Sequence, residues 1–301
     1  MFSAFRGFGF RHSALSSHHS AFQPVLTRII SDVHYQDPAS WIQELSQLEP
    51  LLQGVDLLIV NGDLLDTQIL TDAGPTVAKI KTFIAERVPQ VIYVTGNHDP
   101  DISATHEISL AQDAIWITHG DVFFDDIAPW GRPVIELRRR IRALAGDLPT
   151  AEFRKLETRF KIFRQVTLKL PREHDPESRG FFAKCRRIFR AAFPPTRILT
   201  MIRVWREMPD IASRFADEQR PRAKVILTGH THFHGVWKRG RHVIVNTGSL
   251  CAPREGQIVD LTDNALAVRR VARRAGKFYP GKTVEQFSFA SLSIPAVTNI
   301  V

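Results

Sequence analysis

Short motifs of Asp, Asn and His, most of them with a glycine, recur between Ser31 and His232 of this 301-residue chain. The motifs are Ser31-Asp32-Val33-His34, Asn61-Gly62-Asp63-Leu64-Leu65-Asp66, Gly96-Asn97-His98-Asp99, His119-Gly120-Asp121 and Gly229-His230-Thr231-His232. Imidazole, carboxylate and amide ligands without thiolate suit Mn, Fe, Co or Zn. Two such cations about 3.5–4 Å apart activate a shared water and clamp a phosphoryl oxygen. The residue types therefore predict a two-metal hydrolytic centre.

Each motif comes directly after a short apolar run that predicts a buried strand. These runs are Val25–Ile30, Asp56–Val60, Val91–Val94, Ala114–Thr118 and Lys224–Leu227. Amphipathic spacing predicts helices over Trp41–Leu52 and Val77–Val88, so strands and helices alternate in an α/β fold whose first strands are parallel. The carboxyl ends of parallel strands lie along one edge of a sheet, so we expect the motifs to meet there.

The chain after the fifth motif predicts antiparallel strands. Gly235–Trp237 and Val243–Val245 flank a turn with Gly240 as its pivot, which is typical of a hairpin. A final strand pair is predicted over Gln257–Asp260 and Ala265–Val271.

The predicted organisation has four parts. Residues 25–130 and 222–275 form the core, and residues 131–221 form a basic helical insertion. Residues 276–301 show no clear period and are expected to be a C-terminal tail. Residues 1–24 contain Arg, His and Ser but no acid, so they indicate a disordered or targeting extension.

The five motifs, in this order, resemble the calcineurin-like metallophosphoesterase superfamily. The shared pattern is Asp-x-His, Gly-Asp-x-x-Asp, Gly-Asn-His-Asp, His-Gly and Gly-His-x-His. The resemblance implies an αββα sandwich of mixed sheets, here with an inserted helical cap. It also implies that a dinuclear centre cleaves phosphodiester, phosphomonoester or pyrophosphate bonds with a metal-bridging hydroxide. The expected cofactor is two divalent ions, Mn first, with Fe, Zn or Co as alternatives.

The resemblance also assigns roles to individual residues. It implies that Asp32, His34 and His232 bind the first metal, that Asn97, His119 and His230 bind the second, and that Asp63 bridges them. His98 would act on the leaving group as a general acid or stabilise charge, and Asp99 would orient it.

Other polar residues near the motifs have ordinary structural interpretations. Asp66 is either part of the site or a hydrogen-bond acceptor that holds its loop. His242 is expected on the surface of the predicted hairpin. Cys251 is expected to be a small core residue, and it and Cys185 show no disulfide or metal spacing. This cysteine usage is typical of a reducing, cytoplasmic compartment.

Positive charge is concentrated in the insertion. The chain has a formal net charge of +9, whereas the segment from Gly131 to Ala223 has 23 Lys and Arg against 11 Asp and Glu, a net of +12. Apolar residues at helical spacing predict helices in Phe153–Leu170, Phe181–Arg190 and Ile198–Met208, which would form a cap over or beside the metal edge.

Three interpretations of this cap remain open. It is an ordinary helical subdomain, a surface that lies on an anionic bilayer and reaches a phosphorylated lipid, or, less favoured, a nucleic-acid groove. Its partners would accordingly be a phosphorylated small molecule or lipid-linked substrate, with peripheral membrane contact through residues 131–221. Composition leaves the oligomeric state open.

The lipid interpretation has a counterpart in the same superfamily. His-Gly-Asp followed by a long basic helical insertion resembles the branch that hydrolyses UDP-2,3-diacylglucosamine. This chain departs from that branch at His98, where the branch generally carries Arg, and after Gly-His-Thr-His, in the segment Asn246–Ser249. A non-catalytic scaffold on the same fold is the remaining alternative, but scaffolds are expected to lose ligands, and every ligand position here is filled.

Overall fold

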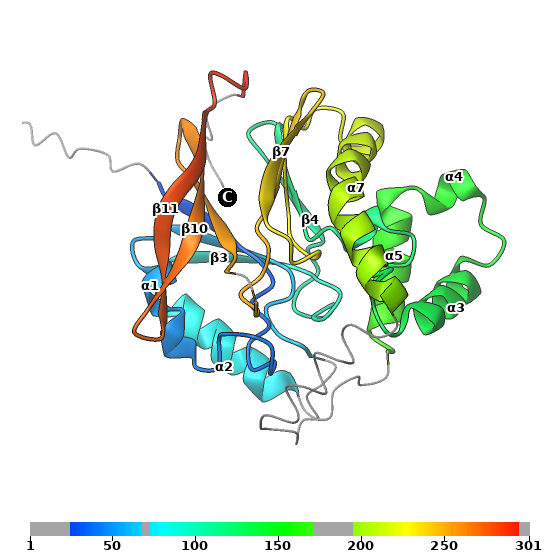
Figure 1. The fold of residues 1–301 in the computed structure, drawn as a ribbon, viewed down its shortest axis with the longest axis horizontal. Helices are drawn as coiled ribbons and strands as arrows, with labels where there is room; N and C mark the ends of the chain where they lie inside the picture. The colour runs from blue at the N-terminus through cyan, green and yellow to red at the C-terminus, as the bar shows by residue number, and fades with distance from the viewer. Residues whose placement is uncertain (1–24, 68–72, 171–194, 254, 295–301) are drawn as a thin grey trace, which may run out of the picture.

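Two mixed β-sheets pack face to face, and helices cover their outer faces (Figure 1). The structure is a computed structural model that describes residues 25–67, 73–170, 195–253 and 255–294. The strand order is β11-β10-β9-β1-β2-β3 in the first sheet and β4-β5-β6-β8-β7 in the second. The predicted αββα sandwich of mixed sheets is confirmed.

The first sheet begins with three parallel strands, β1 (Thr27–Ile30), β2 (Leu57–Asn61) and β3 (Gln90–Val94). Antiparallel strands β9 (Gln257–Leu261), β10 (Ala265–Arg274) and β11 (Lys277–Ser288) extend it beyond β1. All residues of β1, β2 and β9 are buried, and most of them are apolar. The buried Arg28 of β1 and Asp260 of β9 form an ion pair (2.7 Å).

The second sheet contains β4 (Glu107–Leu110), β5 (Ile115–Thr118), β6 (Val225–Thr228), β7 (Gly235–Arg239) and β8 (His242–Asn246). Strands β5, β6 and β8 run parallel, and β7 and β8 form the predicted hairpin. The apolar side chains of the two sheets meet in one core, with Ile29 and Ile59 from the first sheet and Ile117 and Leu227 from the second.

The outer face of the first sheet is covered by α2 (Ala73–Ala85) and by two short elements, the 3-10 helix η1 (Leu45–Gln47) and α1 (Glu49–Leu52). The single helix predicted over Trp41–Leu52 is therefore wrong. Trp41 N–H donates to the carbonyl of Leu250 (2.8 Å), which holds the first residues in an extended path. Pro50 lacks the N–H that a continuous helix would need at this point.

The outer face of the second sheet is covered by the inserted segment. Its helices are η2 (Asp121–Phe123), α3 (Val134–Ala145), α4 (Thr150–Phe153), α5 (Leu156–Thr167) and α7 (Pro195–Gln219). Leu156 and Phe163 of α5 and Met208 of α7 pack against Trp116 and Ile226 of the sheet. In the described residues the insertion is thus a layer of the sandwich, and the predicted stripe over Phe181–Arg190 lies outside them.

Residues 277–288, which were expected to belong to a C-terminal tail, instead form β11 along β10. The apolar period is weak because β11 is an edge strand and most of its residues are exposed or half-buried. Strand β4 is also absent from the prediction. None of the helices in the described part of the chain is long and apolar enough to cross a membrane.

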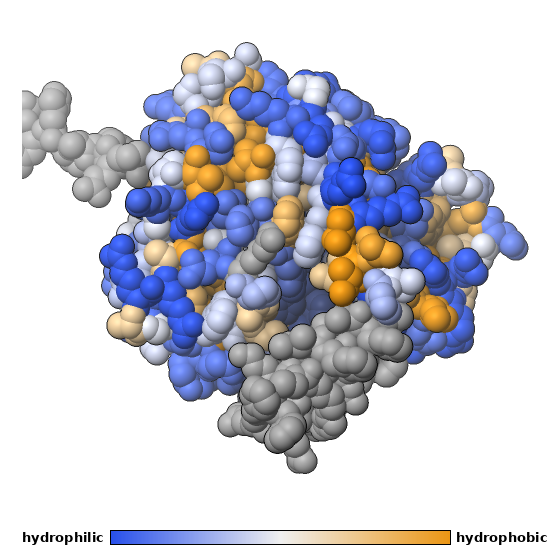
Figure 2. All heavy atoms as spheres, in the orientation of Figure 1, coloured by the Kyte–Doolittle hydropathy of each residue, from blue (hydrophilic) through white to orange (hydrophobic). Residues whose placement is uncertain are grey.

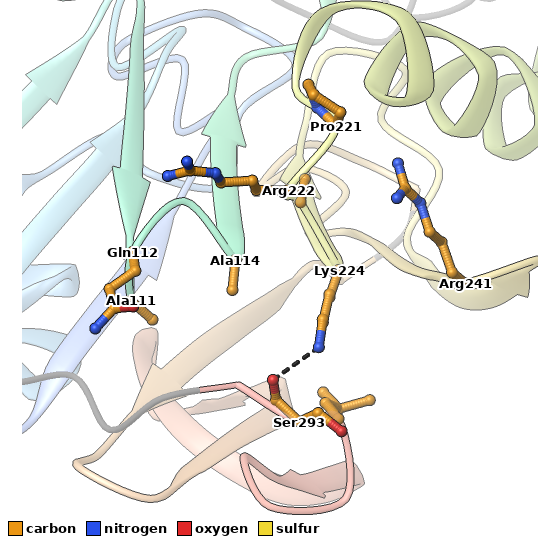
Figure 3. Close-up of a pocket in the computed structure, with 10 residues that line it drawn as sticks. Ala111, Gln112, Ala114, Pro221, Arg222, Lys224, Arg241 and Ser293 are labelled. Carbon is orange, nitrogen blue, oxygen red and sulfur yellow. Dashed lines mark hydrogen bonds between the residues drawn. The ribbon is translucent and has the colours of Figure 1, made fainter.

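A hollow of about 460 Å³ lies at the amino ends of β5 and β6, at the opposite end of these strands from the motifs (Figure 3). Three basic side chains line it, and each has a partner. Lys224 Nζ donates to the carbonyl of Ser293 (2.7 Å), Arg222 lies 3.5 Å from a carboxylate oxygen of Asp113, and Arg241 is paired with Asp217. The two arginines are therefore paired with carboxylates, and the lysine is hydrogen-bonded to the backbone.

Candidate metal centre

The five motifs meet at the facing edges of both sheets, whereas the sequence predicted a single sheet edge. Asp32 and His34 follow β1, Asp63 follows β2 and Asn97 follows β3, all in the first sheet; His119 follows β5, and His230 and His232 follow β6, in the second. Hydrogen bonds join the two edges, because His230 N–H donates to both carboxylate oxygens of Asp32 (3.0 and 3.1 Å).

The first ligand group consists of Asp32, His34, Asp63 and His232, whose ligand atoms all lie within 4.8 Å of one another. The Nε2 atoms of His34 and His232 are 3.1 Å apart, and His232 Nε2 lies 3.3 Å from Asp32 Oδ1. His34 Nε2 lies 3.8 Å from Asp63 Oδ2. One cation at this point would accept electron pairs from all four of these side chains.

The second ligand group consists of Asp63, His119 and His230. His119 Nε2 lies 3.2 Å from Asp63 Oδ2 and 3.3 Å from Asn97 Oδ1, which brings the predicted amide ligand to the same point. Asp63 belongs to both groups, and the same oxygen, Oδ2, faces His34 and His119. The structure therefore brings together all seven predicted ligands, with Asp63 between the two groups.

Backbone carbonyls determine which nitrogen each histidine of the second group presents. His119 Nδ1 lies 3.0 Å from the carbonyl of Asn61, and His230 Nε2 lies 2.9 Å from the carbonyl of Ile127. The opposite nitrogens, Nε2 of His119 and Nδ1 of His230, are left for a metal. Burial and the neighbouring His119 lower the pKa of His230 to about 3, so this ring is neutral and ready to ligate.

Carboxylates raise the pKa of three histidines of the site in the metal-free protein, namely His34, His98 and His119. Burial alone would lower the pKa of His34, but Asp66 and Asp63 outweigh it and raise the pKa to about 9. Desolvation likewise opposes protonation of His98, yet the same two carboxylates raise its pKa to about 10. The same balance raises the pKa of His119 well above its ordinary value, with Asp63 as the main charge.

The carboxylate that contacts His98 is Asp66, so the predicted role of Asp99 is wrong. Asp66 Oδ1 makes a close contact with His98 Nδ1 and lies 3.4 Å from His34 Nδ1. Asp66 itself is 6% exposed, whereas the His98 side chain is 41% exposed. Asp66 thus links a metal ligand to the one proposed catalytic side chain that opens to solvent.

Asp99 is fully buried and holds the backbone of the site. Its carboxylate accepts the N–H groups of Asp63 (3.0 Å), Leu64 (2.7 Å) and Gly96 (2.9 Å), which ties the loop after β2 to the loop after β3. Burial, with the negative charge of Asp63, raises the pKa of Asp99 to about 7. The residue therefore positions the shared ligand Asp63.

A second support comes from the loop after β8. Asn246 Nδ2 donates to the carbonyl of Gly229 (2.6 Å) and to Thr231 Oγ1 (3.0 Å), which holds the turn that carries His230 and His232. Thr247 Oγ1 lies 2.6 Å from Ser31 Oγ, next to Asp32. The loop Asn246–Ser249 therefore acts on the ligands through hydrogen bonds to their backbone and neighbours.

Two tryptophans lie against the metal centre, one from the segment before α3 and one from α7. The ring of Trp130 is 5.0 Å from that of His230. Trp205 of α7 donates Nε1–H to the carbonyl of Thr231 (3.0 Å) and stacks on Phe233, the residue after His232, at 4.7 Å. These contacts attach the helical layer to the site.

Two further expectations concern residues near the site. His242 was expected on the surface of the hairpin, but it is 1% exposed and its Nδ1 lies 2.8 Å from Ser213 Oγ of α7, so it joins the hairpin to the helical layer. Cys251 is buried and free, as expected of a core residue.

Backbone geometry supports metal binding by these residues. Five of the seven ligands, namely Asp32, His34, Asp63, His230 and His232, have φ between 46° and 67°, a conformation that costs non-glycine residues energy and is concentrated at functional sites. A Cβ on Gly96 would lie 2.0 Å from Asp63 Oδ1, and a Cβ on Gly229 would lie 2.1 Å from Asp32 Oδ2. The glycines thus make room for the carboxylates, and the donor set fits two divalent cations.

Comparisons with known proteins find several similar solved structures. The solved structures that are similar include a predicted phosphoesterase from Streptococcus pneumoniae (16% identity, 89% of this chain and 99% of that chain covered, TM-score 0.38). They also include a zinc complex of Vps29 from Entamoeba histolytica (14%, 88% and 99%, TM-score 0.41) and a dimetal phosphatase from Danio rerio (11%, 88% and 99%, TM-score 0.41). Comparison with curated protein sequences gives no match.

The family assignment rests on a sequence model. The model described as calcineurin-like phosphoesterase matches residues 27–234, from β1 to the last predicted ligands, which is more than half of the chain. The chain therefore belongs to the calcineurin-like phosphoesterase family.

Proposed function

We propose that this chain is a dinuclear metal-dependent phosphohydrolase that cleaves phosphodiester, phosphomonoester or pyrophosphate bonds. The observation that carries the proposal is the position of Asp63, whose Oδ2 faces ligands of both groups at 3.2 and 3.8 Å. A carboxylate shared in this way offsets the repulsion between two nearby cations. The family assignment and the complete set of ligands support the same function.

Two divalent cations would supply Lewis-acid activation of the phosphoryl group and would lower the pKa of water that serves as the nucleophile. We propose Mn²⁺ as the first choice, with Fe, Zn or Co as alternatives, because the ligands combine imidazole, carboxylate and amide without thiolate. The two ligand groups, which share Asp63, would hold these ions together with Asn97.

His98 is proposed to protonate the leaving-group oxygen. Its side chain is the exposed member of the His34–Asp66–His98 cluster, so a substrate can reach it. Asp66 orients the ring through Nδ1, which leaves Nε2 to donate a proton. The pKa of about 10 in the metal-free protein keeps this proton in place at neutral pH, and bound cations would lower that pKa toward the range where a proton is easily given up.

The first test is a hydrolysis panel with metal-loaded protein. Bis-aryl phosphodiester, aryl monoester and an aryl-linked pyrophosphate are compared in Mn²⁺ for the wild-type chain and for Asp63→Ala. Asp210→Ala, which removes an exposed carboxylate of α7 paired with Arg239, is the matched control. The proposal predicts hydrolysis of at least one class, loss in Asp63→Ala, and no change in Asp210→Ala. Equal rates for Asp63→Ala and the wild type would refute it.

A further inference from the structure

Exposed aliphatic side chains are concentrated in the helical layer. Among the described residues, the large apolar side chains that are more than 40% exposed are Val25, Ile135, Leu144, Leu148, Leu168, Ile198, Leu199, Ile202 and Val284. Seven of these nine belong to the insertion, between residues 135 and 202. A folded domain normally scatters such residues over its surface, so their concentration in one region indicates an interaction surface.

Helix α7 changes character along its length. In its second half, Met208, Ala212 and Ala216 are buried against the second sheet. In its first half, Leu199 is 66% exposed and Ile202 is 43% exposed. The helix therefore has an apolar face that the rest of the described structure does not bury. Figure 2 shows apolar side chains gathered over this part of the molecule, beside the hollow next to the sheets.

This exposed face is aligned with the metal centre. Ile198, Ile202 and Trp205 are spaced at i, i+4 and i+7 and so share one side of α7. Trp205 reaches the loop of His230 and His232 through its hydrogen bond to Thr231. Ile202 and Ile198 thus lie about one and two helical turns before Trp205, which contacts the loop of the metal site.

The start of α3 lies close to the start of α7. Arg197 Nε donates to the carbonyl of Trp130 (3.1 Å), which precedes α3 by a few residues. Ile135, in the first turn of α3, is 78% exposed. We define the lipid face as Ile135, Ile198, Leu199 and Ile202, the exposed aliphatic residues at these two helix starts.

The surroundings of the lipid face are strongly basic. The segment from Gly131 to Ala223 has a net charge of +12, more than the whole chain. In α3, arginines stand at positions 138, 139, 140 and 142, and the carboxylates that pair with them are Glu136 and Asp126, so positive charge remains in excess. Exposed aliphatic residues next to a positive surface are the combination that binds anionic membranes, where apolar side chains enter the interface and cations meet the headgroups.

We propose that the lipid face docks on an anionic lipid bilayer. The docking proposal depends only on the exposed aliphatic residues and the positive charge around them. Its consequence, that the metal edge acts on a phosphoester at the membrane surface, rests on the proposed function. Nucleic acid fits less well, because base stacking needs exposed aromatic rings and every exposed large apolar residue in the described chain is aliphatic.

The test is co-sedimentation of the full-length protein with vesicles of phosphatidylcholine alone or mixed with phosphatidylglycerol. The wild type is compared with Leu199→Glu/Ile202→Glu, and Val284→Glu on β11, a residue of matching exposure (41%) outside the insertion, is the control. Both altered α7 residues are exposed, and unchanged thermal melting confirms folding. Binding does not require hydrolysis, so the same measurement on Asp63→Ala separates docking from catalysis.

We expect binding to the anionic vesicles that weakens at high salt, a loss of at least about tenfold in the double variant, and no change in Val284→Glu. Asp63→Ala should bind vesicles like the wild type. The proposal is overturned if the wild type does not bind anionic vesicles, or if the double variant binds them as well as the wild type does. Binding to single-stranded DNA that the double variant also loses, without vesicle binding, would assign the face to nucleic acid instead.

Discussion

The two ligand groups share Asp63 but differ in charge and access. The first group contains two carboxylates, Asp32 and Asp63, and its His232 side chain is 40% exposed. In the second group His119 is 1% exposed, and Asp63 is the only carboxylate. The ring of Trp130, which precedes the insertion, also packs against His230 of this group. The first group is thus the more anionic and open, and the second is more neutral and enclosed.

The two ligand groups therefore differ in how they would bind a metal. A group with two carboxylates and a partly exposed histidine attracts a cation electrostatically and exchanges it readily, whereas an enclosed histidine-rich group depends on orientation by backbone carbonyls. We therefore expect the first metal to exchange faster and the second to be more strongly coupled to folding.

The largest expected effects come from removing one histidine of each group. His119→Ala should lose the second metal and leave the carbonyl of Asn61 without its imidazole partner, at a cost of about 1–3 kcal/mol in the free energy of unfolding. His232→Ala should lose the first metal with little change in stability, because its side chain is half-exposed. Each should reduce phosphodiester hydrolysis by about a thousandfold, since a Lewis acid contributes several kcal/mol to the transition state.

Metal content and denaturant unfolding of the metal-free variants check this contrast. Equal losses in the free energy of unfolding for His119→Ala and His232→Ala would show that enclosure of the second group does not contribute to stability.

The next effect concerns the space around the shared ligand. Gly96→Ala would place a Cβ 2.0 Å from Asp63 Oδ1, so Asp63 must move and both groups should bind metal about 10–100-fold more weakly. The control is Gly240→Ala in the β7–β8 turn, where a Cβ meets nothing within 4 Å and only the positive φ of 54° is strained. Calorimetric titration with Mn²⁺ measures both, and normal affinity in Gly96→Ala would contradict the role given to Asp63.

A smaller effect is expected from Asp66→Asn, which keeps the shape but removes the charge that faces His98 and His34. Both metals should remain, while kcat falls about 10–100-fold and KM changes little. The acidic limb of the pH–rate profile reports on the proton of His98 and should change shape in this variant. A fall in metal content instead would place Asp66 among the ligands.

The smallest effect is the pH dependence of metal binding. In the metal-free protein the pKa of His34 is raised to about 9 and that of His119 is also raised, so both rings carry protons at pH 7 that a metal must displace. Affinity should therefore rise with pH, by about tenfold per proton released and per pH unit, and the contribution of His34 should level off above about pH 9. Titration in buffers of different ionisation enthalpy counts the protons released. Affinity that is independent of pH between 6.5 and 8.5 would contradict the raised pKa values.

The ligands could be predicted from the sequence because each lies within a few residues of a buried strand. A strand of apolar residues followed by Asp, Asn or His is a local signal, and parallel strands bring such ends together without knowledge of side-chain packing. The distribution of these strands over two sheets came from the family resemblance and could not be read from their local sequence.

The role of Asp66 and Asp99 could not be predicted, because both carboxylates end a motif in the same way. Which of them meets His98 depends on how the loops after β2 and β3 fold against each other. Asp66 contacts His98, and Asp99 accepts backbone N–H groups instead. The helical layer posed the same difficulty. Met208 and Ile202 are both apolar residues of α7, yet Met208 is buried and Ile202 is exposed. Tertiary packing decides which apolar residues of the helix contact the sheet.

The most direct test of the account is stepwise Mn²⁺ reconstitution of metal-free protein, with phosphodiester hydrolysis and bound metal measured at each step. A dinuclear centre held by Asp63 predicts two ions bound per chain and full activity only at the second equivalent. Activity that saturates with one bound ion, or that needs no metal, would contradict the central claim.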